Sequence, residues 1–222
     1  MQIDFHAHVL PGADHGSANL DVSLKQVALA RKAGIDVLIA SPHFYPHRES
    51  PESFFERRET TAALLRQNYP ENAPKLLVGA EAHLCRGLHH MEDLKKLCIE
   101  GTNVLLLELP ADFSVSGYES TLEGLRCDFD LQIVLAHIDR YPAQTIDFLL
   151  DYGFYAQLNA SAFCRMRTRR LALERVKDER VVALGSDIHG CSTGYEEYFQ
   201  MRRRLGDSYE TVMKRTQKLL GL

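Results

Sequence analysis

Short apolar runs alternate with helical patterns along the whole chain. Each run is rich in Val, Ile, Leu or Phe, and the seven runs occupy residues 2–5, 36–40, 75–80, 103–109, 131–136, 154–158 and 181–184. Several are almost continuously apolar, which is typical of strands buried on both faces of a parallel sheet. Between them, helical spacing of apolar residues predicts helices at 21–33, 53–68, 90–98, 119–127, 143–152, 165–177, 194–205 and 208–220.

The alternation of strands and helices predicts the fold class. Repeated βα units imply right-handed crossovers and a parallel sheet. Seven strands within 222 residues favour an α/β fold of the TIM-like type, with a closed or nearly closed barrel, in a single domain spanning residues 1–222. The rival is an open doubly wound sheet, which usually has a glycine-rich phosphate loop after its first strand. This chain has His6-Ala7-His8 there instead.

Composition narrows the function classes. The formal net charge of -4 counts against a nucleic-acid partner, because such proteins are more often basic. No apolar stretch approaches the roughly 20 residues of a membrane span, and the first residues do not form a signal peptide. The five cysteines are scattered and form no Cys-x-x-Cys pair, which suits a reducing compartment. We therefore expect a cytoplasmic protein.

Residues of metal-ligand type stand where the predicted strands end. In a β/α barrel these ends meet at one face, where functional residues lie. Imidazole and carboxylate groups together are ligands for Zn, Mn, Fe and related divalent ions. The candidate ligands are His6, His8, His15, His43, Glu81, Glu108, His137, Asp187 and His189.

The spacing of these residues adds weight to a metal site. Residues i and i+2 of a strand point the same way, so His6 and His8 can chelate one ion, and Asp187 and His189 repeat the pattern at the last strand. Nine candidates are too many for one ion, so we expect two or three, bridged by Glu81 or Asp187. Ions about 3.5–4 Å apart suit displacement at phosphorus.

Eight motifs, taken together and in order, resemble the polymerase-and-histidinol-phosphatase (PHP) superfamily. The chain is most similar to its branch of manganese-dependent bacterial protein-tyrosine phosphatases from capsule and exopolysaccharide operons. The matching stretches lie at 3–12, 14–17, 40–43, 79–81, 107–110, 136–141, 158–161 and 185–189. The resemblance implies a distorted seven-stranded barrel with three metal ions, Mn before Zn or Fe. It also implies metal binding at the candidate ligands and phosphate contact by Arg140, whose planar fork matches phosphate oxygens.

Two departures from the family pattern bear on the site. Asp14-His15-Gly16 stands where the family usually has Asp-Asp-Gly, so we expect His15 to replace an aspartate ligand, with Asp14 as the alternative. The tyrosine phosphatases also tend to carry an arginine shortly after the last histidine, and residues 190–195 contain none. Arg165, Arg167, Arg169 and Arg170 follow the sixth strand and are candidates to supply that charge.

The sequence therefore predicts a metal-dependent phosphomonoester hydrolase in which Arg140, His43 and His189 act in catalysis. The favoured substrate is a phosphorylated protein, such as the phosphotyrosine tail of a capsule-assembly kinase. Alternatives are a small phosphomonoester, as in histidinol phosphatases, a different metallohydrolase (an amidohydrolase or TatD-like nuclease), or a non-catalytic regulator. The oligomeric state stays open. Four further histidines are interpreted as surface or helix-start residues, namely His47, His83, His89 and His90.

Overall fold

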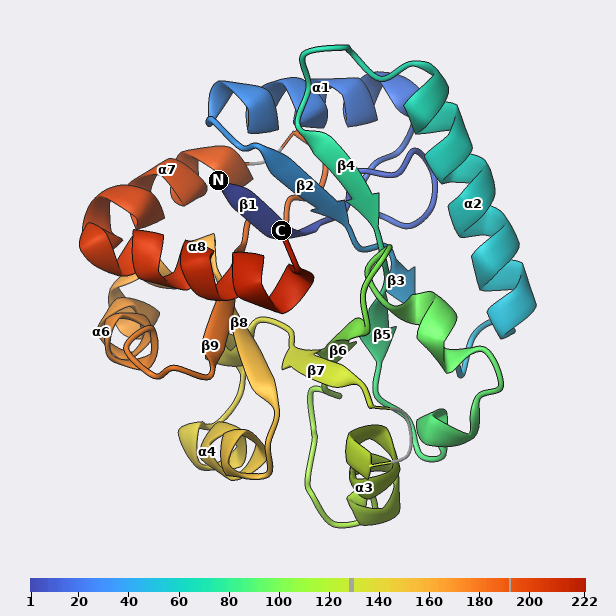
Figure 1. Cartoon of the computed structure of the whole chain (residues 1–222), viewed down its shortest axis with the longest axis vertical. Helices are drawn as coiled ribbons and strands as arrows, with labels where there is room; N and C mark the ends of the chain where they lie inside the picture. The colour runs from blue at the N-terminus through green and yellow to red at the C-terminus, as the bar shows by residue number, and fades with distance from the viewer. Residues whose placement is uncertain (128–129, 192) are drawn as a thin grey trace.

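Parallel strands alternate with helices from one end of the chain to the other (Figure 1). The computed structural model describes residues 1–127, 130–191 and 193–222, and Ser192, in the segment that lacks an arginine, lies outside them. The nine strands found there are β1 Ile3–Ala7, β2 Val37–Ala40, β3 His43–Phe44, β4 Lys75–Val78, β5 Glu81–His83, β6 Val104–Glu108, β7 Gln132–Leu135, β8 Tyr155–Asn159 and β9 Val181–Gly185. The expected α/β fold with parallel strands is confirmed.

The strands form two sheets, with orders β1-β2-β4 and β3-β5-β6-β7-β8-β9. The expected count of seven strands in one barrel is not reproduced, because two of the predicted paths are interrupted. The second breaks at Ser41-Pro42, and the third breaks at Gly79-Ala80. Proline has no N–H to donate to a ladder, which favours a break at that point. Each break moves the chain from the smaller sheet to the larger one.

A second junction joins the sheets at β1 and β9. A single parallel bridge links Ala7 to Ile188, just beyond β9. The His8 N–H donates to the Ile188 carbonyl at 3.2 Å, and the Asp187 N–H donates to the His6 carbonyl at 2.8 Å. The fully buried Asp4 carboxylate accepts from the Ser186 N–H and the Tyr195 hydroxyl, both at 2.8 Å. These bonds hold the first and last strand ends side by side.

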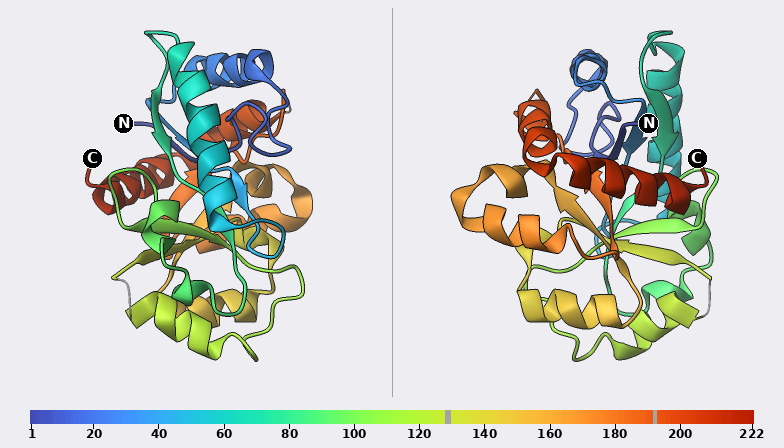
Figure 2. Two further views of the ribbon diagram at one scale, coloured as in Figure 1. Left: turned by 90° about the vertical axis from the view of Figure 1, so that its right-hand side faces the viewer. Right: turned by 60° about the vertical axis from the view of Figure 1, so that its left-hand side comes forward.

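Eight helices lie around the sheets over the described residues (Figures 1 and 2). They are α1 Leu20–Lys32, α2 Pro51–Gln67, α3 Glu119–Cys127, α4 Ala143–Asp151, α5 Ala160–Cys164, α6 Met166–Arg175, α7 Gly194–Leu205 and α8 Asp207–Leu220. Their ends follow local chemistry: the Asn19 side chain accepts from the Val22 N–H at the start of α1, and Gly34 follows its end with φ 78°. None of these helices is long and apolar enough to cross a membrane.

Two predicted helices differ from the structure. The segment predicted as a helix at 90–98 instead forms two short 3-10 helices, η1 Leu88–His90 and η2 Leu94–Leu97. The segment predicted at 165–177 is preceded by a separate helix, α5, and Arg165 lies at the junction with α6 in extended conformation. Both differences reflect tertiary packing, since Leu94, Leu97 and Phe163 are fully buried.

The Asp4 carboxylate gives a test of the β1–β9 junction. Asp4→Ala leaves the buried Ser186 N–H and Tyr195 hydroxyl without their acceptor, so the free energy of unfolding should fall by about 3 kcal/mol. Asp36→Ala is the matched control, because Asp36 accepts from the Gln2 N–H at the exposed start of the same region. Urea denaturation in the presence of a chelator measures both variants. Equal effects of the two substitutions would contradict the role given to Asp4.

Candidate metal centre

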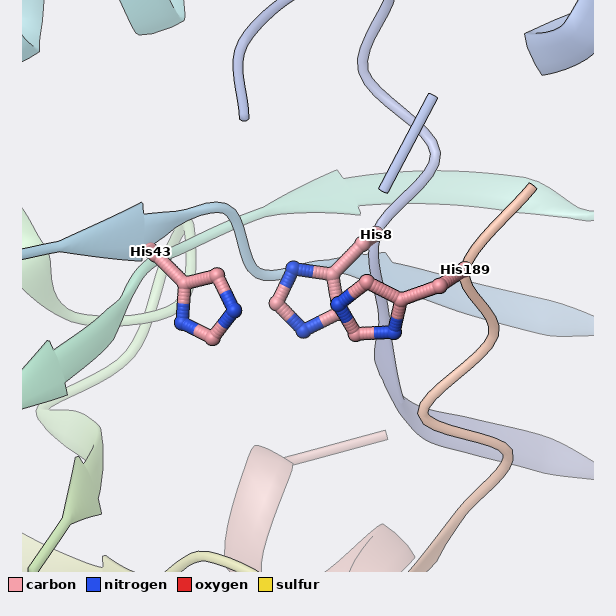
Figure 3. A group of neighbouring side chains, drawn as sticks. All are labelled: His8, His43 and His189. Atoms are coloured by element: carbon pink, nitrogen blue, oxygen red, sulfur yellow. The ribbon is translucent and has the colours of Figure 1, made fainter. Parts of the chain in front are cut away.

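Imidazole and carboxylate groups from opposite ends of the chain converge where the strands end. Three groups of side chains have ligand atoms within 4.8 Å of one another: His8, His43 and His189; His6, His8 and Asp187; and His43, Glu81 and Glu108. Figure 3 shows the rings of His8, His43 and His189 gathered together, each reached from a different segment. Every residue in these three groups is one of the ligands that the sequence predicts, so the structure brings these predicted ligands together.

The carboxylate of Glu81, at the start of β5, lies at the middle of the cluster. Its Oε2 atom is 3.2 Å from His6 Nε2, 3.3 Å from His8 Nε2 and 2.9 Å from His43 Nδ1. Its Oε1 atom lies 2.8 Å from His137 Nε2, which is hydrogen-bond distance. The side chain is fully buried. One carboxylate thus touches four imidazoles carried by three different segments of the chain.

Several nitrogen and oxygen atoms of this cluster lie close together without forming a hydrogen bond. Among the described residues, His43 Nδ1, Glu81 Oε2 and His189 Nε2 are buried without a hydrogen-bond partner. His6 Nε2 and His8 Nε2 face each other at 3.0 Å. Buried polar atoms in native proteins nearly always have partners. Divalent ions that take lone pairs from these nitrogen and oxygen atoms would satisfy them, so the residues fit a metal centre.

The charges of the cluster are mutually dependent. Burial alone would raise the pKa of Asp187, but the neighbouring His6 and His8 hold that pKa well below its usual value. Burial would lower the pKa of His8, whereas the neighbouring carboxylates of Asp14, Asp187 and Glu81 hold it well above the usual value. Burial and the nearby His8 lower the pKa of His189 to about 4. These shifts favour a neutral imidazole at His189 and a protonated imidazole at His8 as long as no ion is bound.

The first loop places Asp14 and His15 in different roles. Asp14 Oδ2 accepts from His8 Nδ1 at 2.7 Å and from the His43 N–H at 3.0 Å, so it orients His8 from behind. The His15 ring stacks near His43 and His189, with ring centroids 4.9 and 4.6 Å away. His15 belongs to none of the three groups of converging ligand atoms among the described residues. Its assignment as a ligand stays a prediction.

Two polar residues of β8 make hydrogen bonds to residues of the cluster. Gln157 is fully buried, and its Oε1 atom accepts from the His137 N–H at 2.7 Å and lies 3.3 Å from His6 Nδ1. Asn159 Nδ2 donates to Asp187 Oδ2 at 2.8 Å. Asn159 belongs to the motif at 158–161, whereas Gln157 lies just outside it and was not singled out from the sequence. Its signal was a polar residue inside an otherwise apolar strand.

Sequence reasoning also misplaced two histidines. His83 Nδ1 lies 3.1 Å from Glu108 Oε2, so His83 contacts a predicted ligand and is not a simple surface residue. His89 is buried under α3, where its ring fills the space that a side chain at Gly124 would occupy. His47 and His90 are exposed, as expected. Only tertiary contacts separate these four histidines, which look alike in the sequence.

The backbone is shaped to aim the ligands. His137 and Asp187 adopt positive φ values of 33° and 50°, a region that non-glycine residues rarely occupy. Such strain persists where the surrounding structure holds it, and it gathers at functional sites. At Gly16, an added Cβ would lie 2.0 Å from His8 Cβ. Only glycine allows the first loop to pass this close to the ligand strand.

A cavity of about 440 Å³ opens over the cluster. Arg140 lies at its wall, half exposed, with its guanidinium 2.5 Å from Asp187 Oδ2. Tyr45 lines the same cavity and packs against His43, with ring centroids 5.1 Å apart. Of the four arginines considered for the charge missing after His189, Arg165 lines this cavity, whereas Arg169 and Arg170 line a neighbouring groove. The cavity thus combines converging ligands, an aromatic ring and two guanidinium groups.

The fold and the cluster together define a class: TIM-barrel-like α/β proteins that hold metal ligands at the carboxyl ends of parallel strands. A TatD-like protein from Archaeoglobus fulgidus has this kind of fold, with a TM-score of 0.56 and 16% identity over 99% of this chain and 100% of its own. The phosphotriesterase homology protein of Escherichia coli, solved with phosphate in its active site, gives a TM-score of 0.56 and 13% identity over 99% and 97% of the two chains.

Within that class, the sequence profile described as capsular polysaccharide synthesis, CpsB/CapC, matches residues 2–217. The chain therefore belongs to the CpsB/CapC family. It is 24% identical to the tyrosine-protein phosphatase YwqE of Bacillus subtilis, over 98% of this chain and 91% of that one. A solved structure from work on YwqE and on CpsB of Streptococcus pneumoniae, described as metal-dependent tyrosine phosphatases, superimposes with a TM-score of 0.82 at 20% identity, over 99% and 94% of the chains. The family resemblance seen in the motifs is confirmed.

The raised pKa of His8 predicts that metal binding releases protons. An ion can bind the imidazole only after its proton leaves, so affinity for Mn²⁺ or Zn²⁺ should rise with pH through the neutral range. Calorimetric titration of the protein in two buffers of different ionisation enthalpy measures the number of protons released. Binding heats that do not depend on the buffer would contradict this prediction.

The close approach of Gly16 to His8 predicts a specific loss of metal affinity. Gly16→Ala must displace His8, so affinity should fall by about tenfold or more, the usual range for a disturbed ligand environment. Gly12→Ala is the control in the same loop. Gly12 also has a positive φ, of 70°, but an added Cβ there would meet nothing within 4 Å. The control should lose some stability and keep its metal affinity. Equal affinity losses would overturn the argument.

Proposed function

We propose that this chain is a metal-dependent phosphatase that hydrolyses phosphotyrosine in protein substrates. The observation that carries the proposal is the set of buried, unpartnered donor atoms around Glu81, directly beneath a cavity that also holds Arg140. The donors suit divalent cations, and the guanidinium suits a phosphate dianion. A metal site and a phosphate-binding arginine in one cavity are the two requirements of metal-assisted phosphoester hydrolysis.

The residues that would hold the ions are the nine predicted from the sequence. Eight of them, all except His15, lie within the cluster around Glu81, or contact it. Bound divalent ions supply charge neutralisation at the phosphoryl group and activation of a water nucleophile. We infer two or three ions, with manganese favoured over zinc or iron. We also infer that the two sheets act together as the distorted barrel that the family resemblance implies.

The remaining residues of the cavity bind and orient the substrate. The guanidinium of Arg140 is half exposed and can turn from Asp187 towards the phosphoryl oxygens. Its hydrogen bonds to those oxygens would strengthen as negative charge develops on them. The ring of Tyr45 offers an aromatic surface beside His43, suited to the phenyl ring of phosphotyrosine. His189 and His43 both line the cavity, with ring centroids 5.9 Å apart, so both rings stand where the phosphoryl group would bind. These contacts support the catalytic roles predicted for Arg140, His43 and His189.

The substrate class rests on relatives as well as on the cavity. YwqE is named a tyrosine-protein phosphatase, and the family is described by capsular polysaccharide synthesis. We therefore propose a phosphorylated protein of the capsule or exopolysaccharide assembly system as the partner, such as a tyrosine kinase tail. A cytoplasmic location and a single domain over the whole chain complete the proposal.

A turnover assay tests the function directly. We expect the purified protein to hydrolyse p-nitrophenyl phosphate and a phosphotyrosine peptide at mildly alkaline pH when Mn²⁺ is added, and to stop when a chelator is added. Arg140→Lys keeps the charge but loses the bidentate fork, so kcat/KM should fall by about tenfold or more. Arg126→Lys is a matched control on the exposed face of α3.

The outcomes separate the alternatives. Turnover of histidinol phosphate or another small phosphomonoester, without turnover of phosphotyrosine peptides, would move the assignment to a small-molecule phosphatase. Cleavage of DNA or of an amide substrate instead would favour the TatD-like or amidohydrolase alternatives. Protein that binds ions but turns over none of these substrates would sink the phosphatase proposal and favour a non-catalytic regulator.

A further inference from the structure

The helix that follows the sixth predicted strand carries an unusual density of positive charge. Between positions 165 and 177 stand five arginines and one lysine, against the single acid Glu174, although the whole chain has a net charge of -4. The side chains of Arg165, Arg167, Arg169, Arg170 and Lys177 are exposed. None of them contributes to the apolar core, so the fold alone does not account for this charge.

Helical spacing arranges part of this charge as a stripe. Residues four apart lie on one face of a helix, which puts Arg169 and Leu173 of α6 in line. Arg165 stands directly before the helix, and Lys177 stands two residues after its end. The Arg169 N–H donates to the Arg165 carbonyl at 3.0 Å, so the first step of the stripe is one helical turn. The opposite face of α6, with Leu171 and Ala172, turns to α4 and η3 (Ile138–Arg140).

The stripe borders a groove between α6 and the last two helices. A hollow of about 370 Å³ lies between α6 and the last two helices, and its one acidic residue, Glu174, is paired with Arg170. It is lined by Arg169, Arg170, Leu173, Glu174, Val176, Lys177, Arg204, Leu205 and Ser208. Figures 1 and 2 both place α6 beside these two helices. The Arg204 guanidinium also donates to the Phe163 carbonyl of α5, which holds it at the wall of the groove. The groove thus has basic side chains on both walls.

The groove and the cavity over the metal centre are lined by residues one helical turn apart. Arg165, the first residue of the stripe, lines the cavity over the metal centre together with Arg140. The next residue of the stripe, Arg169, lines the groove. Within the described part of the chain, neither Arg169 nor Lys177 has an ion-pair partner, whereas Arg170 pairs with Glu174 at 3.2 Å. A bound chain could therefore pass from the cavity into a groove that offers free positive charge.

We propose that this groove binds the acidic residues that flank the phosphorylated residue of a polypeptide substrate. The inference rests on the proposed phosphatase function and narrows its substrate class. The ten residues of α6 rise about 15 Å, so the stripe with the flanking Arg165 and Lys177 is roughly 15–20 Å long. An extended peptide covers that length with about five residues. The recognised substrates are thus acidic within about five residues on one side of the phosphotyrosine, and their binding weakens as salt screens the charges.

Paired peptides and a charge-reversed chain test the groove. Phosphotyrosine peptides with glutamates on the amino or the carboxyl side are compared with peptides that carry glutamine at the same positions. The Mn²⁺-loaded protein is compared with Arg169→Glu/Lys177→Glu and with Lys25→Glu/Lys32→Glu, which reverses two exposed charges on α1. For each protein, the kcat/KM for each peptide is divided by the kcat/KM of the same protein for p-nitrophenyl phosphate. Binding is measured in parallel by fluorescence anisotropy, with labelled peptides that carry a non-hydrolysable phosphonate.

For one of the two glutamate peptides, we expect the groove variant to lose at least about fivefold in relative kcat/KM and in affinity, mainly through KM. The glutamine peptides and the α1 variant should stay unchanged. Equal binding of glutamate and glutamine peptides by the native chain, or an equal loss in both charge-reversed variants, would overturn the groove. Displacement of the acidic peptide by oligothymidylate at equal concentration would overturn the choice of a polypeptide.

Failure of the peptide-binding groove can be distinguished from failure of the proposed phosphatase activity. If no peptide and no p-nitrophenyl phosphate is turned over, the phosphatase proposal fails, and the anisotropy measurements still decide whether acidic peptides occupy the groove.

Discussion

The buried carboxylate of Glu81 is the constraint on which the site depends. A lone carboxylate without solvent would be strongly unfavourable, because burial penalises its charged form. The imidazoles of His6, His8, His43 and His137 surround it, and together they hold the pKa of Glu81 well below its usual value. Because those imidazoles come from β1, β3 and the end of β7, the charge of one residue binds distant strands into a single cluster. The same arrangement leaves lone pairs that divalent ions would satisfy.

The surroundings of the cluster fix its geometry before any ligand arrives. Asp14 and Gln157 each contact a ring nitrogen of a histidine ligand, which sets how that ring is turned. Positive φ values at His137 and Asp187 show backbone held in a strained region at the same place. The bonds from Asp4 across the β1–β9 junction keep the first and last ligand segments in register. Stability and metal binding are therefore coupled through the same strand ends.

Much of this could be read from the sequence because the signals are local. Apolar runs predicted every strand found except the short β3 and β5. Ligand-type residues at the ends of those runs drew attention to residues that the structure brings into one cluster, namely His6, His8, His43, Glu81, Glu108, His137, Asp187 and His189. The interruptions at Ser41-Pro42 and Gly79-Ala80 were not anticipated, since periodicity does not reveal where one path changes sheets. His83, His89 and Gln157 were missed for a related reason: their roles arise from contacts 20 or more residues away.

The sequence by itself determined the α/β fold class and the family, and it predicted which residues converge at the strand ends, because strand periodicity and motif order are properties of neighbouring residues. The tertiary structure alone decided which predicted ligands contact Glu81, and that Asp14 rather than His15 is hydrogen-bonded to His8. It also placed His15, Arg140 and Arg165 together around the cavity. It also decided that Arg169 and Arg170 of α6 line a groove beside the last two helices. These outcomes depend on how segments far apart in the chain pack together, and packing in three dimensions is not encoded in any local pattern.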